Sequence, residues 1–131
     1  MADIKSSVII YDINGNLLLQ LRDEEPEINK WVLFGGSVEG DETEEEAARR
    51  EIKEELKYKI KKMHFFKTYQ NDKVKQPIFI VDNPVSLSEL SLCEGSNLRF
   101  FSPKDIDSLN IGFNYKIILK DYLTLRNNPF F

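Results

Sequence analysis

The stretch "GGSVEGDETEEEAARREIKEEL", from Gly35 to Leu56, joins a glycine pair to an acidic turn and a strongly helical segment. Nine of the chain's 22 acidic residues fall between Glu39 and Glu55. Thr43 stands three residues before Glu46, which is the spacing of a capping box. The following segment contains good helix formers and neither Gly nor Pro. We therefore predict a helix over Glu44–Leu56.

The acidic residues of this helix gather beside its apolar side. Residues advance by about 100° per position around a helix. Glu51 and Glu55 are four positions apart, and Glu54 extends the same acidic edge, whereas Arg49 and Lys53 fall on the opposite side. The acidic edge adjoins an apolar stripe, predicted to face the core, that consists of Ala48, Ile52 and Leu56.

Such a cluster is unfavourable unless something positive lies on it. Two like charges about 6 Å apart repel by roughly 0.7 kcal/mol in water and by about 3 kcal/mol at an effective dielectric constant of 20. A solvated helix edge is one interpretation, and a bound divalent cation is the other. Carboxylates suit Mg²⁺ or Mn²⁺, whose other ligands are water and substrate phosphate. The pair Gly35-Gly36 favours the cation, because only glycine allows so close a backbone approach to the helix start.

Around this stretch the sequence predicts strands and one further main helix. Asn14-Gly15 lies between two apolar runs, which is typical of a β-hairpin. Ser102-Pro103 is typical of the start of a short helix. Strands around two main helices favour a layered domain of the α/β or α+β class. The expected strands are Ser6–Asp12, Leu17–Asp23, Trp31–Phe34, Lys59–Gln70, Gln76–Val85 and Asn97–Ser102, and the closing helix is Asn114–Arg126.

Length and composition fit one domain over residues 1–131, and the 41% hydrophobic and 31% charged residues are typical of a globular chain. A net charge of −4 argues against bulk nucleic-acid binding. The single cysteine, Cys93, excludes a disulfide within the chain and a cysteine zinc site. No signal peptide or membrane-length apolar run is present, so we expect a cytoplasmic protein without a membrane partner.

The spacing of Gly36, Glu42 and the run Arg50–Glu55 resembles the box of the Nudix (MutT-like) hydrolase family. That box is a glycine, five residues, a glutamate, seven residues, and then Arg-Glu-apolar-any-Glu-Glu-any-Gly-apolar. Seven residues of the chain fit it in type and spacing, and the flanking segments also resemble the family. Two positions depart from it: Lys57 replaces the last glycine, and Phe34 stands where many members have proline.

The resemblance implies an α/β/α sandwich with a mixed β-sheet, in which the box forms a loop–helix–loop. It implies that Glu51, Glu55 and the Gly36 carbonyl hold Mg²⁺ or Mn²⁺, and that Glu54 shares a metal or its water. Arg50 is then a catalytic residue that pairs with a glutamate and orients it. Lys57 in a left-handed helix cap costs about 1 kcal/mol, or else the helix continues past it.

Three residues around the box are further candidates for the site. The general base differs among family members and sometimes lies outside the box, which makes Glu94 a catalytic candidate; an exposed loop carboxylate is the alternative. Glu39 and Trp31 are candidates for substrate binding, although core packing is the other interpretation of Trp31. His64 is the only histidine, and a structural role is the simpler interpretation.

The resemblance implies hydrolysis of the diphosphate linkage of a nucleoside diphosphate bonded to a further group X. A (d)NTP or damaged-dNTP pyrophosphohydrolase that releases NMP is the leading expectation. An ADP-ribose or nucleotide-sugar pyrophosphatase is the alternative enzyme, and a non-catalytic nucleotide sensor is the alternative of another class. The aromatic tail "NNPFF" has two interpretations: it docks on the domain itself, or it docks on a second subunit, as in a homodimer.

Overall fold

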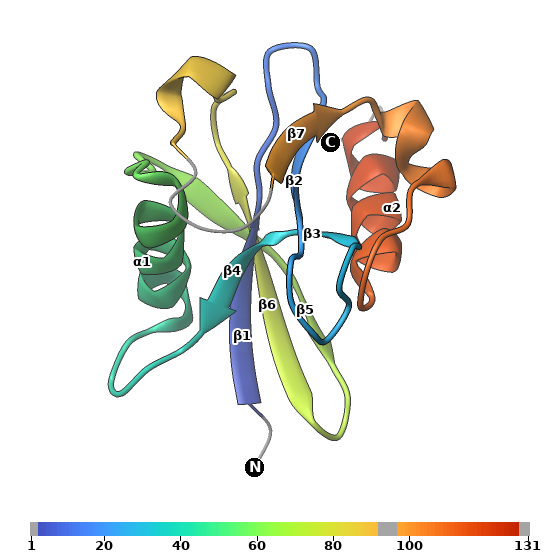
Figure 1. Ribbon diagram of the computed structural model, residues 1–131. Helices are drawn as coiled ribbons and strands as arrows, with labels where there is room; N and C mark the ends of the chain where they lie inside the picture. Colours follow the sequence, from blue (N-terminus) through green and yellow to red (C-terminus); the bar gives the residue numbers. More distant parts are fainter. Residues whose placement is uncertain (1–2, 92–96, 129–131) are drawn as a thin grey trace.

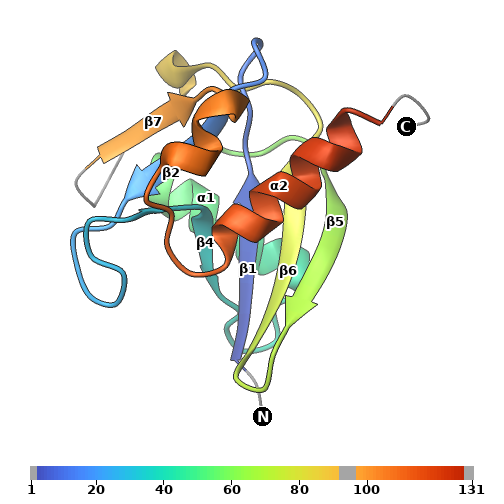
Figure 2. The same cartoon turned by 90° about the vertical axis from the view of Figure 1, so that its right-hand side faces the viewer.

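The computed structural model describes residues 3–91 and 97–128. Its elements in chain order are β1 (Asp3–Ile9), β2 (Leu17–Leu21), β3 (Trp31–Val32), β4 (Phe34–Ser37), α1 (Glu44–Leu56), β5 (Met63–Gln70), β6 (Val74–Val81), η1 (Leu87–Glu89), β7 (Asn97–Phe101), η2 (Pro103–Ser108) and α2 (Tyr115–Arg126). The strands lie between α1 on one side and α2 on the other (Figures 1 and 2). The α/β/α layering implied by the family resemblance is therefore confirmed.

The strands form two sheets. The first has the order β4-β1-β6-β5 and is mixed, because β1 runs parallel to β6 and antiparallel to β4. The second has the order β3-β2-β7 and is antiparallel. The sequence suggested a single mixed sheet, whereas the structure adds a small second one that includes β2.

Successive side chains along the central strands point to opposite faces of the sheet, and this divides the core into two clusters. At the end of β1, Ile9 packs in the cluster on the α2 side, whereas Val8 and the next residue after the strand, Ile10, pack in the cluster on the α1 side. The same alternation separates Leu17 and Leu19 of β2 from Leu18. Strands that are buried on both faces show continuous apolar runs, which explains "VII" and "LLL" in the sequence.

The predicted hairpin about Asn14-Gly15 is wrong in its pairing. The turn forms, with the Asp12 side chain accepting from the backbone N–H groups of Asn14 and Asn16. Beyond the isolated bridge between Tyr11 and Leu17, however, the strands diverge into different sheets. The reason is that β4 and β6 already occupy both edges of β1.

The expected strand Trp31–Phe34 is also wrong in its bounds. Trp31 and Val32 belong to β3 in the second sheet, and the chain crosses at Leu33 into β4, which continues through the glycine pair to Ser37. The strand expected to begin at Lys59 begins at Met63 instead. Lys59 and Lys61 therefore lie in the connection after α1 and not on a strand.

Candidate functional site

Helix α1 begins and ends with defined caps. The Thr43 side chain accepts from the Glu46 N–H while the Glu46 carboxylate accepts from the Thr43 N–H, which completes the predicted capping box. Lys57 ends the helix in the left-handed conformation, with φ 51° and ψ 35°. The predicted apolar stripe is buried together with Ala47. This anchoring turns the edge that carries Glu51 and Glu55 toward β4.

The glycine pair of β4 lies directly against these two carboxylates. A Cβ atom at Gly36 would overlap the Glu51 carboxylate, so a larger residue cannot occupy this position without displacing Glu51. The backbone N–H of Gly35 hydrogen-bonds Glu55. Gln20 of β2 adds a side-chain hydrogen bond to Glu55, from Nε2 to Oε2 at 3.2 Å.

Glu51 and Glu55 form a close acidic pair whose carboxyl groups hydrogen-bond each other. Burial, the hydrogen bond to Glu51 and the charge of Glu51 raise the pKa of Glu55 to about 8. At neutral pH, two carboxylates so close together are both ionised only when a positive charge lies between them. A hard divalent cation meets this requirement with the oxygen ligands that it prefers.

Arg50 neutralises the outer part of the acidic cluster. Its guanidinium lies 2.6 Å from Glu42, 3.0 Å from Glu51, 3.2 Å from Glu54 and 3.8 Å from Glu39. It also donates to the Ser37 carbonyl at 3.0 Å, which ties the segment after β4 to the helix. These hydrogen bonds raise the pKa of Arg50, and the one to Glu42 lowers the pKa of that carboxyl group. The Glu51–Glu55 contact is thus the part of the cluster that Arg50 does not fully neutralise.

The protein side chains alone do not enclose an ion. Among residues 3–91 and 97–128, no group of three acidic, histidine or cysteine side chains is arranged to hold one. Mg²⁺ is commonly bound by one or two carboxylates, with water and substrate phosphate as the other ligands. The residues present fit that mode, because the Glu51–Glu55 pair adjoins the Gly36 backbone, which also lines a pocket.

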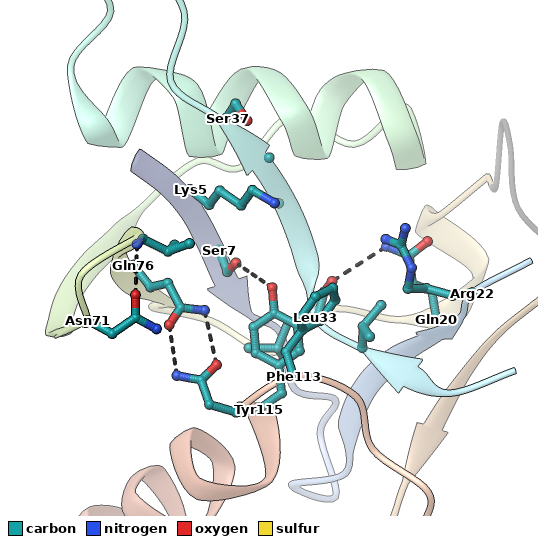
Figure 3. A pocket seen from close by; sticks show the side chains of 15 residues that line it. Lys5, Ser7, Gln20, Arg22, Leu33, Ser37, Asn71, Gln76, Phe113 and Tyr115 are labelled. Atoms are coloured by element: carbon teal, nitrogen blue, oxygen red, sulfur yellow. Dashed lines mark hydrogen bonds between the residues drawn. The ribbon is translucent and has the colours of Figure 1, made fainter. Parts of the chain in front are cut away.

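The pocket lies on the other side of the glycine pair and has a volume of about 480 Å³. Figure 3 shows its polar side chains, which come from β1, from β2 and the residue after it, from β4, from β6 and the turn before it, and from the start of α2. Gly35, Gly36 and Gln20 belong to the pocket wall and also lie next to the acidic pair. The other lining residues are Lys5, Ser7, Arg22, Val32, Leu33, Ser37, Asn71, Val74, Gln76, Phe113, Asn114 and Tyr115.

The predicted site residues differ in where the structure puts them. The members of the box come together at α1 and β4. Glu39 is largely exposed and reaches only the outer side of Arg50. Trp31 is not among the pocket-lining residues; its indole packs edge-on against Phe101 with the ring centres 4.7 Å apart, which fits the core-packing interpretation. Glu94 and Cys93 lie outside the described residues.

Sequence reasoning missed several pocket residues. Gln20 carries a recognisable signal, because it interrupts the apolar run "LLLQL" with a side chain that needs a partner. Lys5 belongs to β1, and its side chain extends toward β4 in Figure 3. Phe113 and Asn114 precede α2 and carry no motif that would have separated them from an ordinary loop.

The layers and the site together define an α/β sandwich with a helix-borne acidic pair next to a pocket. Comparison with protein families gives the narrower assignment: the model of the NUDIX domain matches residues 2–122. The chain therefore belongs to the Nudix hydrolase family, whose members are pyrophosphohydrolases that typically use divalent metals.

Solved structures of this family share the fold. A MutT NUDIX hydrolase from Burkholderia pseudomallei is 22% identical, with a TM-score of 0.80 over 92% of this chain and 97% of that one. A MutT protein from Methanosarcina mazei is 19% identical, with a TM-score of 0.79 over 97% and 96% of the two chains. The NUDIX domain of Shewanella oneidensis NrtR, solved with ADP ribose, is 14% identical, with a TM-score of 0.82 over 97% and 90%. A search of curated proteins gave no match.

Proposed function

We propose that this protein is a divalent-metal-dependent pyrophosphohydrolase of (d)NTPs or damaged dNTPs, which it converts to NMP and pyrophosphate. The observation that carries the proposal is the Glu51–Glu55 pair, held against Gly35-Gly36 at the wall of a pocket of about 480 Å³. A volume in this range suits a small-molecule ligand. The pocket also contains two cationic side chains, Lys5 and Arg22, which suit a polyanion.

Each residue of the box has a proposed role. Glu51, Glu55 and the Gly36 carbonyl would hold Mg²⁺ or Mn²⁺. When bound, such an ion neutralises phosphate oxygens and lowers the pKa of water. Glu54, which is exposed and in contact with Arg50, would accept a proton from the attacking water, and Glu94 is the second candidate for that role. Arg50 orients Glu51 and Glu54 through its two hydrogen bonds to them.

A turnover assay with product analysis tests the proposal. Purified protein with Mg²⁺ or Mn²⁺ is given normal and 8-oxo (d)NTPs, ADP-ribose, nucleotide sugars and dinucleoside polyphosphates. We expect NMP and pyrophosphate from at least one triphosphate, and a loss of at least about 100-fold in Glu54→Gln or Glu55→Gln. Glu45→Gln is the matched control, because Glu45 lies on the same helix but pairs with Arg49 away from the site.

The likeness to the NrtR domain solved with ADP ribose favours one second candidate, a pyrophosphatase of ADP-ribose or nucleotide sugars. It predicts NMP and a sugar phosphate as products. Cleavage of those compounds with no cleavage of any triphosphate would replace the first proposal by the second. A folded protein that binds nucleotides and cleaves none of the panel would contradict both and favour a sensor module.

A further inference from the structure

The side chain of Gln20 joins the second sheet to the acidic helix. Gln20 lies on β2, where its backbone pairs with Val32 of β3 on one side and with Leu98 of β7 on the other. Leu18, two residues earlier and so on the same face of β2, packs in the apolar cluster beside α1. Gln20 therefore puts an amide where the next apolar contact with α1 would fall. A half-buried amide is costly there unless it has hydrogen-bond partners.

The amide of Gln20 finds these partners on two other parts of the fold. Its Nε2 donates to Glu55 Oε2 at 3.2 Å and to the Leu33 carbonyl at 3.5 Å, and Figure 3 shows the second of these bonds. Leu33 is the residue at which the chain crosses from β3 into β4. A glutamine amide has two N–H donors, so the two bonds account for both. This side chain thus connects β2, the start of the glycine strand and the acidic pair.

Glu55 is held by uncharged donors, unlike the outer carboxylates of the cluster. Its carboxylate accepts from the Gln20 amide and from the Gly35 backbone N–H. Arg50 forms ion pairs with the other carboxylates of the cluster but, in the part of the chain that the structure describes, forms none with Glu55. An amide can hold a carboxylate in place without supplying the positive charge that a bound cation would bring. Glu55 is therefore fixed in position and still lacks a counter-charge.

The orientation of this carboxylate affects how well it can bind a metal ion. Glutamate is a long side chain, and fixing it in one rotamer costs conformational entropy. When a hydrogen bond already holds one carboxylate oxygen, that cost falls on folding and not on the binding of the ion. Partners that orient a metal ligand in this way commonly contribute roughly 10- to 100-fold to metal affinity.

We propose that Gln20 is a positioning residue of the metal site, whose amide holds the Glu55 carboxylate against the glycine strand so that Glu51 and Glu55 can share one divalent ion. Gln20 acts through Glu55 and is not itself a ligand of the ion. The inference deepens the proposed function and rests on it for the role of Glu55 as a metal ligand. If the amide only sealed the junction between β2 and α1, its removal would lower stability and leave metal affinity unchanged.

Binding of Mn²⁺ tests the inference without requiring turnover. Gln20→Met keeps a long unbranched side chain but removes the amide donor. Electron paramagnetic resonance of free Mn²⁺, measured with nucleotide-free protein, gives the Kd. We expect Gln20→Met to bind Mn²⁺ about tenfold or more weakly than wild type. Glu55→Gln removes the ligand itself and should bind more weakly still.

Gln76 offers a matched control for the same substitution. It also lines the pocket, but its Nε2 donates to Asn114 Oδ1 at 3.0 Å and not to an acidic residue. Gln76→Met should therefore bind Mn²⁺ like wild type. Gln20→Leu is a second variant, which continues the apolar run of β2 and should lose affinity as Gln20→Met does. Circular dichroism and the Tm of each variant establish that it is folded.

The metal dependence of turnover gives a second readout. A positioning residue changes how much of the protein carries the ion at a given metal concentration. Saturating Mn²⁺ should therefore return most of the turnover that Gln20→Met loses at low Mn²⁺. A variant that had lost a contact with the substrate would stay slow at every metal concentration.

Three outcomes would overturn the inference: a wild type that binds no Mn²⁺, an unchanged Kd in the folded Gln20 variants, or an equal loss of affinity in Gln76→Met. The turnover assay keeps the two proposals separate. Metal-dependent hydrolysis by wild type, with an unchanged Kd in Gln20→Met, overturns this inference and leaves the proposed function intact. Weakened Mn²⁺ binding in Gln20→Met, with no nucleotide hydrolysed by wild type, supports the inference and contradicts the proposed function.

Discussion

At the scale of single residues, the structure places a half-buried acid where an acid is costly. Glu55 lies between the apolar stripe of α1 and the backbone of Gly35, and its carboxyl group meets that of Glu51. Replacing such an acid by an amide removes the repulsion and most of the desolvation cost. The acidic pair therefore costs stability in the absence of a cation. A role in binding a cation would explain why both positions carry an acid.

Glu55→Gln should therefore separate stability from function. In metal-free buffer we expect a Tm equal to or above that of wild type, because an uncharged amide replaces half of the acidic pair. Addition of Mg²⁺ or Mn²⁺ should raise the Tm of wild type by mass action but leave that of the variant unchanged. Differential scanning fluorimetry measures both effects, with Glu45→Gln as control. An equal metal-induced shift in Glu55→Gln would show that the ion binds elsewhere.

Gly36→Ala should disturb the same pair from the opposite side. The added Cβ would overlap the Glu51 carboxylate, so we expect a loss of about 1–3 kcal/mol in the free energy of unfolding together with reduced turnover. Gly40→Ala is the control: its φ is 53°, but an added Cβ meets nothing within 4 Å. It should lose only about 1 kcal/mol to backbone strain and keep its activity. Urea denaturation distinguishes the two, and equal losses would contradict the overlap.

At the scale of elements, α1 shows which features of a helix local sequence signals can predict. The capping box predicts its first residue, and the spacing of Ala48, Ile52 and Leu56 predicts its buried side, because both depend on neighbours within one or two turns. Strand pairing depends on residues far apart in the chain. Nothing in "VIIYDINGNLLL" indicates that β1 pairs with β4 and β6, and nothing at Leu33 marks the crossing between sheets.

The end of α1 gives a test at this scale. Lys57 holds the left-handed cap conformation that favours glycine, while its N–H still bonds the Lys53 carbonyl at 3.0 Å. Lys57→Gly should therefore stabilise the protein by up to about 1 kcal/mol. Lys53→Gly, one turn earlier within the helix, should destabilise it by about 1 kcal/mol. Guanidinium denaturation gives both values, and a loss of stability in Lys57→Gly would mean that the lysine side chain stabilises the cap by more than its backbone strain costs.

At the scale of the whole molecule, the site arises where the layers meet. Helix α1 supplies the acids, β4 the glycine backbone, β2 Gln20, and the start of α2 the ring and amide of Phe113 and Asn114. The acidic half could be predicted because it is one continuous stretch of sequence. The pocket half could not, because its residues come from separate segments that only the tertiary fold brings together.

Within the described residues, neither helix is long and apolar enough to cross a bilayer.

Removal of metal tests whether the fold of the whole molecule depends on the ion at the site. The two apolar clusters on either side of the sheets include no residue of the acidic pair, so the fold should not require the ion. We expect EDTA to abolish turnover, and added Mg²⁺ or Mn²⁺ to restore it, while the far-UV circular dichroism stays unchanged. The Tm should fall by only a few degrees, because the acidic pair then loses the cation that joins it. Cooperative unfolding on chelation would instead identify a structural metal, and turnover that persists in EDTA would remove the acidic pair from the mechanism.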